Sequence, residues 1–396
     1  TPMADADLIV VGGGISGMSL ARTCAEAGMQ VRVLDRGDAP GGCLRSRQAP
    51  DGFWYELGAH TCYNSYQALL ARVQGLPGGL DALVPRAKVP TRLVVDGQVR
   101  SLMGEVRKGE LLAHAPRMFF LRKAGKTVRQ FWGAAVGPRN WERVFSPVFA
   151  AVPSQPADDF PASMLFKPRK RRKDVPRSFT LKGGLQSLTR GLADHPNLLI
   201  HAKADAQAIR RDGDGGFVVQ LAGGDLSAPR VALAVPPDAA ARLLADVLPD
   251  AAAAASRIAT CTVRTLGVAV RREDTPLPPA AFFIPLDDAF RSCVTRDTVP
   301  DARFRGFAFH LRPDVDEATA VARIAEFLGV PEGRWADLAR NQVVLPSPRL
   351  GHESLVAAVD AAIAGTAVAV TGNWFGGLAL EDCVLRSADE ARRMAG

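Results

Sequence analysis

The hydrophobic pattern at the start of the chain predicts a strand, a tight turn, a helix and a second strand. A short apolar run leads directly into three spaced glycines, Gly12, Gly14 and Gly17. An amphipathic segment follows, and a second apolar run, 31–34, ends at Asp35. This order of elements is typical of the unit that binds the phosphates of a dinucleotide beside parallel strands.

Further along, short apolar runs alternate with segments of helical periodicity. The pattern over 89–103 predicts a hairpin around Asp96 and Gly97, a strong turn pair. Helical periodicity dominates 105–149, and the proline-rich stretch 153–176 is predicted to be loop. The predicted strands are 198–209, 216–221, 230–235, 262–270, 280–284, 305–311 and 368–371. The predicted helices are 65–74, 238–248, 316–328 and 381–396, with a turn into a further helix at 181–186.

This succession predicts an α/β fold, α+β over the whole chain, with a discontinuous Rossmann-type domain. Signals of the nucleotide-binding domain recur in the middle and at the end of the chain, which assigns 1–79, 181–257 and 346–396 to it. The stretches 80–180 and 258–345 then form an inserted sheet-plus-helix domain that we expect to bind the substrate. A simple NAD dehydrogenase usually keeps its nucleotide domain in one block, so the alternation favours another class of enzyme.

The chemistry of the first glycine turn follows from its spacing. Glycines at these positions let backbone N–H groups and the positive end of a helix approach a pyrophosphate. Asp35 stands 23 residues after Gly12, at the end of the second strand, where a carboxylate accepts hydrogen bonds from a ribose. The predicted cofactor-binding residues of this segment are Gly12, Gly14, Ile15, Ser16, Gly17, Asp35 and Arg36.

The composition excludes several other classes of protein. Hydrophobic residues make up 47% of the chain, as in an ordinary globular protein with a sizeable core. The six cysteines contain no C-x-x-C pair, which argues against a disulfide framework and a zinc site. We therefore expect no metal site and a reducing, cytoplasmic compartment. The stretch 361–380 carries no charge, but its alanines, glycines and polar residues predict a buried strand and a turn instead of a membrane span.

The charge of the chain is unevenly distributed. The window 100–177 holds 17 lysines and arginines against six acidic residues, so it carries +11 while the rest of the chain carries −3. Such a window is either a solvated basic surface or a contact for an anionic membrane surface, an acidic substrate or an acidic partner protein. A nucleic-acid partner is not expected, because no known nucleic-acid-binding module surrounds its aromatic residues.

Several motifs carry a family resemblance. They are the stretches 41–46 (GGCLRS), 55–60 (YELGAH), 179–185 (FTLKGGL), 346–352 (PSPRLGH) and 372–383 (GNWFGGLALEDC). With these motifs, which are spread over most of its length, the chain resembles the flavin-dependent amine oxidase and protoporphyrinogen oxidase superfamily. Two positions depart from the family pattern: Cys43 stands where an arginine or lysine is usual, and 346–348 lacks the usual tyrosine.

The resemblance implies that the dinucleotide is FAD. The cysteine that anchors flavin covalently in some amine oxidases has no counterpart around 330–371, so we expect non-covalent binding. In place of Cys43, Arg45 is expected to supply the positive charge. The backbone N–H groups of 376–379, at the start of the last helix, are expected to favour negative charge on the flavin ring. The further cofactor-binding residues that the resemblance implies are Gly41, Gly42, Cys43, Leu44, Arg45, Gly58, Ala59, His60, Thr61, Ala206, Gly372, Asn373, Gly377, Leu378 and Ala379.

The resemblance also implies an activity, the removal of hydride from a C–H bond, or an amine-bearing C–H bond, of a small organic substrate. Protoporphyrinogen oxidase is the most similar branch, and dioxygen or a quinone is the expected electron acceptor. Alternatives are a specialised-metabolism oxidase or desaturase for another aromatic, amine or polyene substrate, a non-redox flavin-dependent mutase, and a scaffold without turnover. His60 is the candidate catalytic residue, either accepting a proton or holding substrate, and its alternative is a packed turn histidine.

Overall fold

The computed structural model describes residues 4–396, so residues 1–3, which the sequence assigns to the nucleotide-binding domain, lie outside it. A five-stranded parallel sheet with the order β10-β2-β1-β14-β20 forms the centre of one half of the molecule. Its strands are β1 (Leu8–Val11), β2 (Val31–Leu34), β10 (Leu198–His201), β14 (Val231–Leu233) and β20 (Val368–Val370). The sheet thus collects strands from three distant stretches of the chain. The exact domain boundaries stay a prediction.

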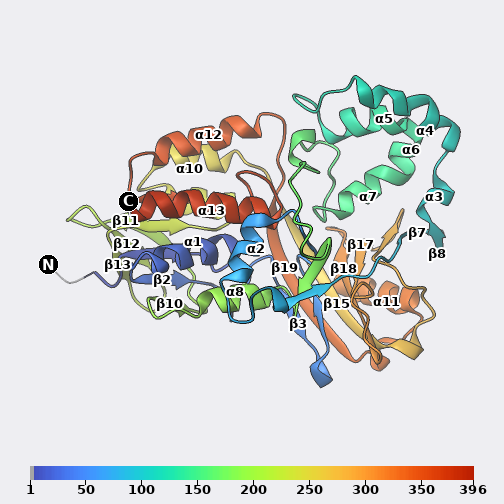
Figure 1. Cartoon of the computed structure of the whole chain (residues 1–396), viewed down its shortest axis with the longest axis horizontal. Helices are drawn as coiled ribbons and strands as arrows, with labels where there is room; N and C mark the ends of the chain where they lie inside the picture. The colour runs from blue at the N-terminus through green and yellow to red at the C-terminus, as the bar shows by residue number, and fades with distance from the viewer. Residues whose placement is uncertain (1–3) are drawn as a thin grey trace.

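Helices cover both faces of this sheet, because its central strands are apolar at successive positions. Leu8 and Val10 face one apolar core, while Ile9 and Val11 face the other. The first core is closed by α1 (Ile15–Glu26), α2 (Gln67–Gln74), α8 (Gln186–Ala193) and α13 (Leu380–Ala395). The second is closed by α9 (Pro237–Leu244), α10 (Pro249–Ser256), α12 (His352–Ile363) and a small sheet of β11 (Ala208–Arg211), β12 (Phe217–Gln220) and β13 (Leu226–Ala228). Figure 1 shows this layered half on the left, with both chain ends at its outer edge.

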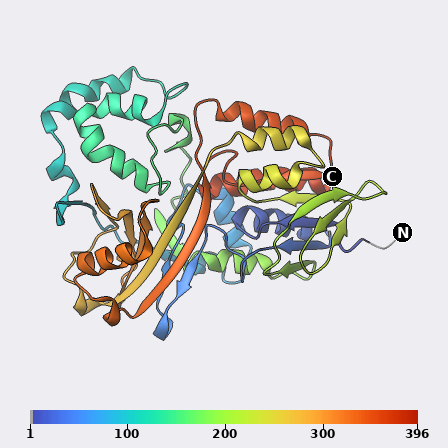
Figure 2. The ribbon, with the colours of Figure 1, turned by 180° about the vertical axis from the view of Figure 1, so that it is seen from behind.

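The other half is built on a seven-stranded sheet with the order β19-β15-β18-β17-β16-β7-β8. Its strands are β7 (Thr91–Val95), β8 (Gln98–Ser101), β15 (Thr260–Arg271), β16 (Phe282–Pro285), β17 (Phe290–Thr295), β18 (Phe304–Leu311) and β19 (Asp337–Pro346). Helix α11 (Glu317–Leu328) covers one face. The long strands β15 and β19 run along the boundary between the two halves (Figure 2).

A helical lobe lies beyond this sheet and contains most of the basic window 100–177 (Figure 1). Its helices are α3 (Leu102–Glu105), α4 (Lys108–His114), α5 (Ala134–Val136), α6 (Pro138–Asn140) and α7 (Ser146–Ala151). Short strands connect the halves: β3 (Ser46–Gln48) pairs with β4 (Trp54–Glu56), and β9 (Ser178–Leu181) pairs with β5 (Cys62–Tyr63) and β6 (Leu83–Pro85).

Most of the elements predicted from the pattern are present, with some differences. The hairpin around Asp96 and Gly97 forms as predicted, with both residues at positive φ. The predicted strand 198–209 is wrong as one element, since β10 and β11 are separate strands in different sheets. Helix α12 and strands β17 and β19 were not predicted. The uncharged stretch 361–380 divides into the end of α12, strand β20 and a glycine turn, and no helix among residues 4–396 is long and apolar enough to cross a membrane.

Candidate FAD and substrate site

The first glycine turn has a backbone that only glycine accommodates. Gly12 adopts φ +105°, and a Cβ atom there would lie 2.3 Å from the carbonyl oxygen of Ala234. A Cβ atom at Gly17 would lie 1.8 Å from the carbonyl oxygen of Gly12. Helix α1 begins at Ile15, and its N-cap residue, Gly14, has no side chain that could accept from the first N–H groups. These N–H groups are therefore free for an anion at the positive end of the helix.

Asp35 follows β2 directly, and its carboxylate still has acceptor positions that could bind the hydroxyl groups of a ribose. One carboxylate oxygen accepts from the N–H of Gly13 at 2.8 Å, and the other accepts from the N–H of Gly37 at 2.7 Å. Because a carboxylate offers about four acceptor positions, about two remain free. The neighbouring side chain, Arg36, is exposed.

The second glycine pair lies directly against the first turn. The N–H of Gly41 donates to the carbonyl of Gly13 at 2.9 Å, and Gly41 pairs with Gly14 in a parallel bridge. Gly42 adopts φ +57°, and a Cβ atom there would lie 2.9 Å from the Cα of Gly14. Two motifs that are about 30 residues apart in the sequence thus form one surface without side chains, as a bound pyrophosphate requires.

The next residues connect this surface to the segment 58–61. A Cβ atom at Gly58 would lie 2.1 Å from the carbonyl oxygen of Cys43, and the same carbonyl accepts from the N–H of Ala59 at 2.8 Å. Leu44 is fully buried in the core. The guanidinium of Arg45 pairs with the carboxylate of Asp38 at 3.0 Å. The charge that the resemblance assigns to Arg45 is therefore shared with an acidic neighbour.

The C-terminal turn reaches the same place. Gly372 and Gly377 adopt φ +151° and +156°, and the Asn373 amide nitrogen lies 3.9 Å from the sulfur of Cys43. Helix α13 begins at Leu380 after Ala379, which provides no side-chain cap. The N–H groups of its first turn are thus available to a partner with negative charge.

The two acidic residues of that first turn already have partners within the protein. The Glu381 carboxylate accepts from the N–H groups of Ala68 and Leu69 at 2.9 and 3.0 Å, at the start of α2. The Asp382 carboxylate pairs with Arg169 at 2.8 Å and with Lys167 at 3.8 Å. Glu381 therefore stabilises the start of α2, whereas the Asp382 carboxylate lies against the glycine turn itself, 2.5 Å from the position of a Cβ atom on Gly377.

His60, the candidate catalytic residue, lies in the segment 58–61 next to the seven-stranded sheet. Its Nδ1 lies 3.3 Å from the carbonyl oxygen of Gly58, and its ring stands edge-on to Phe282 at 5.2 Å. Burial, helped by the nearby Arg86 and His310, lowers the pKa of His60 to about 3. The imidazole is thus neutral at physiological pH and a weak proton acceptor, which favours holding substrate over accepting a proton.

A row of polar side chains crosses the sheet beside His60. Strand pairing aligns Asn341, Thr265, His310 and Ser292, on β19, β15, β18 and β17 in that order. The Thr265 hydroxyl lies 2.9 Å from His310 Nδ1, whereas the Ser292 hydroxyl and the Asn341 amide nitrogen are buried and have no hydrogen-bond partner among the described residues 4–396. Burial lowers the pKa of His310 to about 4, so it is neutral as well.

The row faces the β4 segment. Gly267, two residues from Thr265 on the same face of β15, packs so closely that a Cβ atom would lie 2.2 Å from Leu57. Unpartnered buried polar atoms are costly, and each requires an explanation. Their common face next to segment 58–61 identifies the row as a candidate substrate contact.

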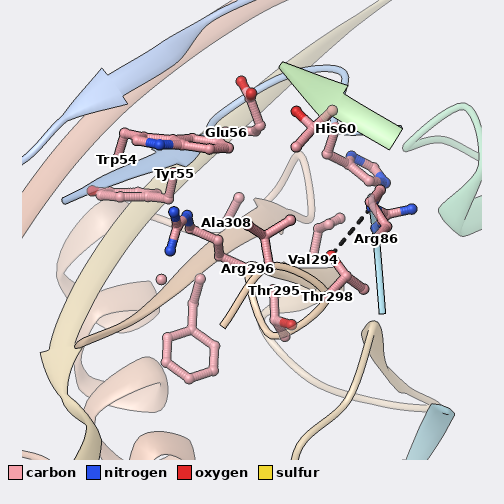
Figure 3. A pocket seen from close by; sticks show the side chains of 14 residues that line it. Trp54, Tyr55, Glu56, His60, Arg86, Val294, Thr295, Arg296, Thr298 and Ala308 are labelled. Carbon is pink, nitrogen blue, oxygen red and sulfur yellow. Dashed lines mark hydrogen bonds between the residues drawn. The ribbon is translucent and has the colours of Figure 1, made fainter. Parts of the chain in front are cut away.

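A small cavity with both apolar and polar lining residues continues from His60 between β4 and the strands β17 and β18 (Figure 3). Its volume is about 20 Å³. Its polar lining residues are Glu56, His60, Arg86, Thr180, Thr295, Arg296 and Thr298. Figure 3 shows Arg86 and Arg296 on opposite sides of the cavity, with the Arg86 Nε donating to the hydroxyl of Thr298 at 3.2 Å.

The cysteines near the site have thiols whose pKa values are raised above the ordinary value. Burial raises the pKa of Cys43 to about 11 and that of Cys383 to about 12. Burial also raises the pKa of Cys62 well above its ordinary value. All six cysteines are free, and no cluster of three or more potential metal ligands occurs within residues 4–396.

The structure brings most of the predicted cofactor residues together, around the three turns described above. Thr61 continues the segment 58–61. Ala206 instead lies in the core beneath the small sheet, where its carbonyl accepts from Arg242, so only its backbone could serve a cofactor. Leu378 packs toward the helical lobe. The sequence did not reveal Arg86, Arg296 or the polar row, because only strand pairing and the chain fold bring these residues together.

Comparisons with known proteins agree with this geometry. A family described as an NAD(P)-binding Rossmann-like domain matches residues 10–74. The 15-cis-phytoene desaturase of Narcissus pseudonarcissus is 35% identical over 79 residues, which cover 20% of this chain and 13% of that relative. The match therefore spans only a small part of the relative.

Solved structures cover the whole chain. A protein of Exiguobacterium sp. 255-15, provisionally assigned as protoporphyrinogen oxidase, superposes with a TM-score of 0.78 at 18% identity, covering 99% of each chain. Putrescine oxidase bound to putrescine gives 0.70 at 16% identity over 98% of each chain. Reduced UDP-galactopyranose mutase gives 0.72 at 15% identity, over 98% of this chain and 95% of that one.

The chain has the fold of the FAD-dependent amine oxidases and protoporphyrinogen oxidase-like proteins, which confirms the fold predicted from its motifs.

Proposed function

We propose that this protein is an FAD-dependent oxidoreductase that removes hydride from a C–H bond, or an amine-bearing C–H bond, of a small organic substrate. The observation that carries the proposal is the meeting of three glycine turns, 12–17, 41–42 and 372–379, at one surface. A Cβ atom would close this surface at several positions, and the helices α1 and α13 begin directly after the turns without a side-chain cap. These features fit a long, anionic dinucleotide.

The residues around the turns have distinct tasks in this proposal. The start of α1 binds the pyrophosphate, Asp35 binds the adenosine ribose, and the start of α13 stabilises negative charge on the flavin ring. FAD, when bound, supplies the hydride-accepting chemistry. The neutral His60 and the polar row across the sheet hold and orient the substrate, and the close packing of β15 on Leu57 excludes water from that side.

We propose that FAD is bound without a covalent link. Cys43 lies beside the turns, but its raised pKa keeps its thiol protonated and unreactive. The other cysteines of the site, Cys62 and Cys383, are buried and protonated as well. Denaturation in acid is therefore expected to release intact FAD into the supernatant, whereas flavin that stays with the protein would contradict this part of the proposal.

The substrate branch is proposed to be protoporphyrinogen oxidase-like, with dioxygen or a quinone as acceptor. Anaerobic titration of the flavin-loaded protein with porphyrinogens, amines and polyenes tests the reaction, because a true substrate bleaches the flavin absorbance. Measuring the rate of oxygen consumption and the rate of quinone reduction then shows which of the two compounds is the electron acceptor. A polyene that alone bleaches the flavin would favour the desaturase alternative, and a sugar nucleotide that isomerises only after reduction would favour the mutase. An unbleached spectrum with every compound would contradict the proposed oxidation.

We also propose that the protein is cytoplasmic and touches anionic membrane surfaces through its helical lobe. Phe119 and Phe120 are 87% and 86% exposed and lie between Arg117, Arg122 and Lys123. Exposed aromatic residues among cations are typical of interfacial binding to acidic lipids. Vesicle sedimentation tests this: phosphatidylglycerol vesicles should retain the protein, neutral phosphatidylcholine vesicles should not, and Phe119→Asp should abolish retention. Equal recovery with both vesicle types would leave an acidic partner protein as the explanation of the basic lobe.

A further inference from the structure

The cavity beside His60 is lined by more cationic than anionic side chains. Asp301 lies outside this lining and acts on Arg296 only through space, where its charge opposes the lowering of the Arg296 pKa by burial. Two guanidinium groups, those of Arg86 and Arg296, line it, and the one acidic side chain in its lining is Glu56. The carboxylate of Glu56 is already used, since its two oxygens accept from the hydroxyl of Ser46 and the N–H of Leu185, each at 2.7 Å. Burial raises the pKa of Glu56 to about 7, so it does not supply a full negative charge at neutral pH.

Arg296 is the group with unmet bonding capacity. Its Nε and Nη1 atoms are buried and have no hydrogen-bond partner within residues 4–396, and the hydroxyl of Thr180 in the same cavity has none either. The guanidinium lies 4.3 Å from the ring centre of Trp54 and 4.8 Å from that of Phe53. This stacking fixes the plane of the guanidinium and leaves its N–H edge for a ligand.

The size of the cavity restricts the ligand. A volume of about 20 Å³ holds roughly one water molecule, since a water needs at least about 10–15 Å³. A space of this size admits the carboxylate end of an acid in place of such a water, while the rest of the molecule must lie outside the cavity. A buried guanidinium whose N–H groups lack acceptors is unfavourable, and an incoming carboxylate would supply charge-assisted hydrogen bonds to those groups.

We propose that this cavity binds the carboxylate of an organic acid substrate, with Arg296 as its principal partner and Arg86 as the second. The inference rests on the proposed function, since the rest of the acid then extends past His60 toward the polar row and the flavin. It restricts the substrate class to compounds with a carboxylate, and a pure hydrocarbon polyene does not satisfy it.

Calorimetric titration of the flavin-loaded protein tests the proposal with matched probes, benzoate against benzamide and phenylacetate against phenylacetamide. Each acid should bind at least tenfold more tightly than its amide. Arg296→Gln should weaken binding of the acids at least tenfold and leave the amides unchanged, while Arg296→Lys should retain part of the preference. Arg303→Gln, which removes an exposed arginine nearby, is the control and should change neither.

Several outcomes would overturn the proposal. These are equal binding of acids and amides, no binding of either acid, and a folded Arg296→Gln protein that binds acids as the wild type does. If Arg296→Gln does not fold, Arg86→Gln provides the same comparison, with an expected loss of at least threefold for the acids. Failure of the proposed function gives a different result. A protein that binds no flavin would contradict the proposed function, whereas flavin that is bleached by neutral substrates with no preference for acids would contradict only this inference.

Discussion

Replacing Gly17 by alanine is the sharpest perturbation of the cofactor site. The added Cβ atom would lie 1.8 Å from the carbonyl oxygen of Gly12 and 3.1 Å from the Cβ of Ala234. Ordinary contact needs about 3.4 Å, so the turn and the start of α1 must separate by about 1.6 Å, and overpacking of this kind costs about 1–3 kcal/mol. The same displacement moves the N–H groups of α1 away from the pyrophosphate.

We expect Gly17→Ala to weaken FAD binding at least 100-fold, or about 2.8 kcal/mol, since each factor of ten corresponds to about 1.4 kcal/mol. The assay is a fluorescence titration of FAD into apoprotein, with thermal unfolding measured with and without FAD. Gly109→Ala is the matched control: it lies in α4, nothing lies within 4 Å of its added Cβ atom, and its FAD affinity should be unchanged. FAD affinity of Gly17→Ala within threefold of the wild type would refute the reasoning.

Three further predictions concern stability, measured as the free energy of unfolding in urea. The pKa of Glu56 is raised to about 7 from its ordinary 4.5, so the folded state holds this proton more tightly than the unfolded chain does. The free energy of unfolding of the wild type should therefore fall by up to about 3 kcal/mol between pH 4.5 and pH 8. The Glu56→Gln variant should not show this fall. Parallel pH profiles of the two proteins would contradict the prediction. Glu381→Ala should lose about 2–3 kcal/mol because two N–H groups of α2 lose their acceptor. The control Glu353→Ala, which changes an exposed residue, should lose under about 0.5 kcal/mol. Equal losses in the two variants would contradict this prediction. Ser292→Ala removes a buried hydroxyl without a partner, so it should be neutral or about 1 kcal/mol more stable, and a marked loss would reveal a missing partner.

The cofactor turns could be predicted from the sequence because their chemistry is local. Glycine is required at Gly12 and Gly377 because the backbone adopts a positive φ there and a neighbouring group lies too close for a Cβ atom. Both requirements arise within short segments, so they are visible as short sequence motifs. The hairpin at Asp96 and Gly97 could be predicted for the same reason. The family resemblance then assigned motifs that are hundreds of residues apart in the sequence to one cofactor site.

Other elements could not be predicted, for identifiable reasons. Helix α12 is rich in alanine, and only a short turn separates it from the apolar strand β20, so the sequence gives no clear boundary between the two elements. The polar row depends on strand register: Thr265, His310 and Ser292 each look like single polar positions in apolar strands, and only pairing aligns them. Arg296 carries no motif, since its role follows from which side chains the fold leaves without a partner.

The central claim is that three glycine turns form one FAD site, and the FAD content of the purified protein tests it most directly. The protein is incubated with FAD, freed of unbound flavin and denatured in acid, and the supernatant flavin is identified and counted. The account predicts about one intact FAD per chain, released without a covalent link. A protein that retains no FAD after this treatment while remaining folded would contradict it.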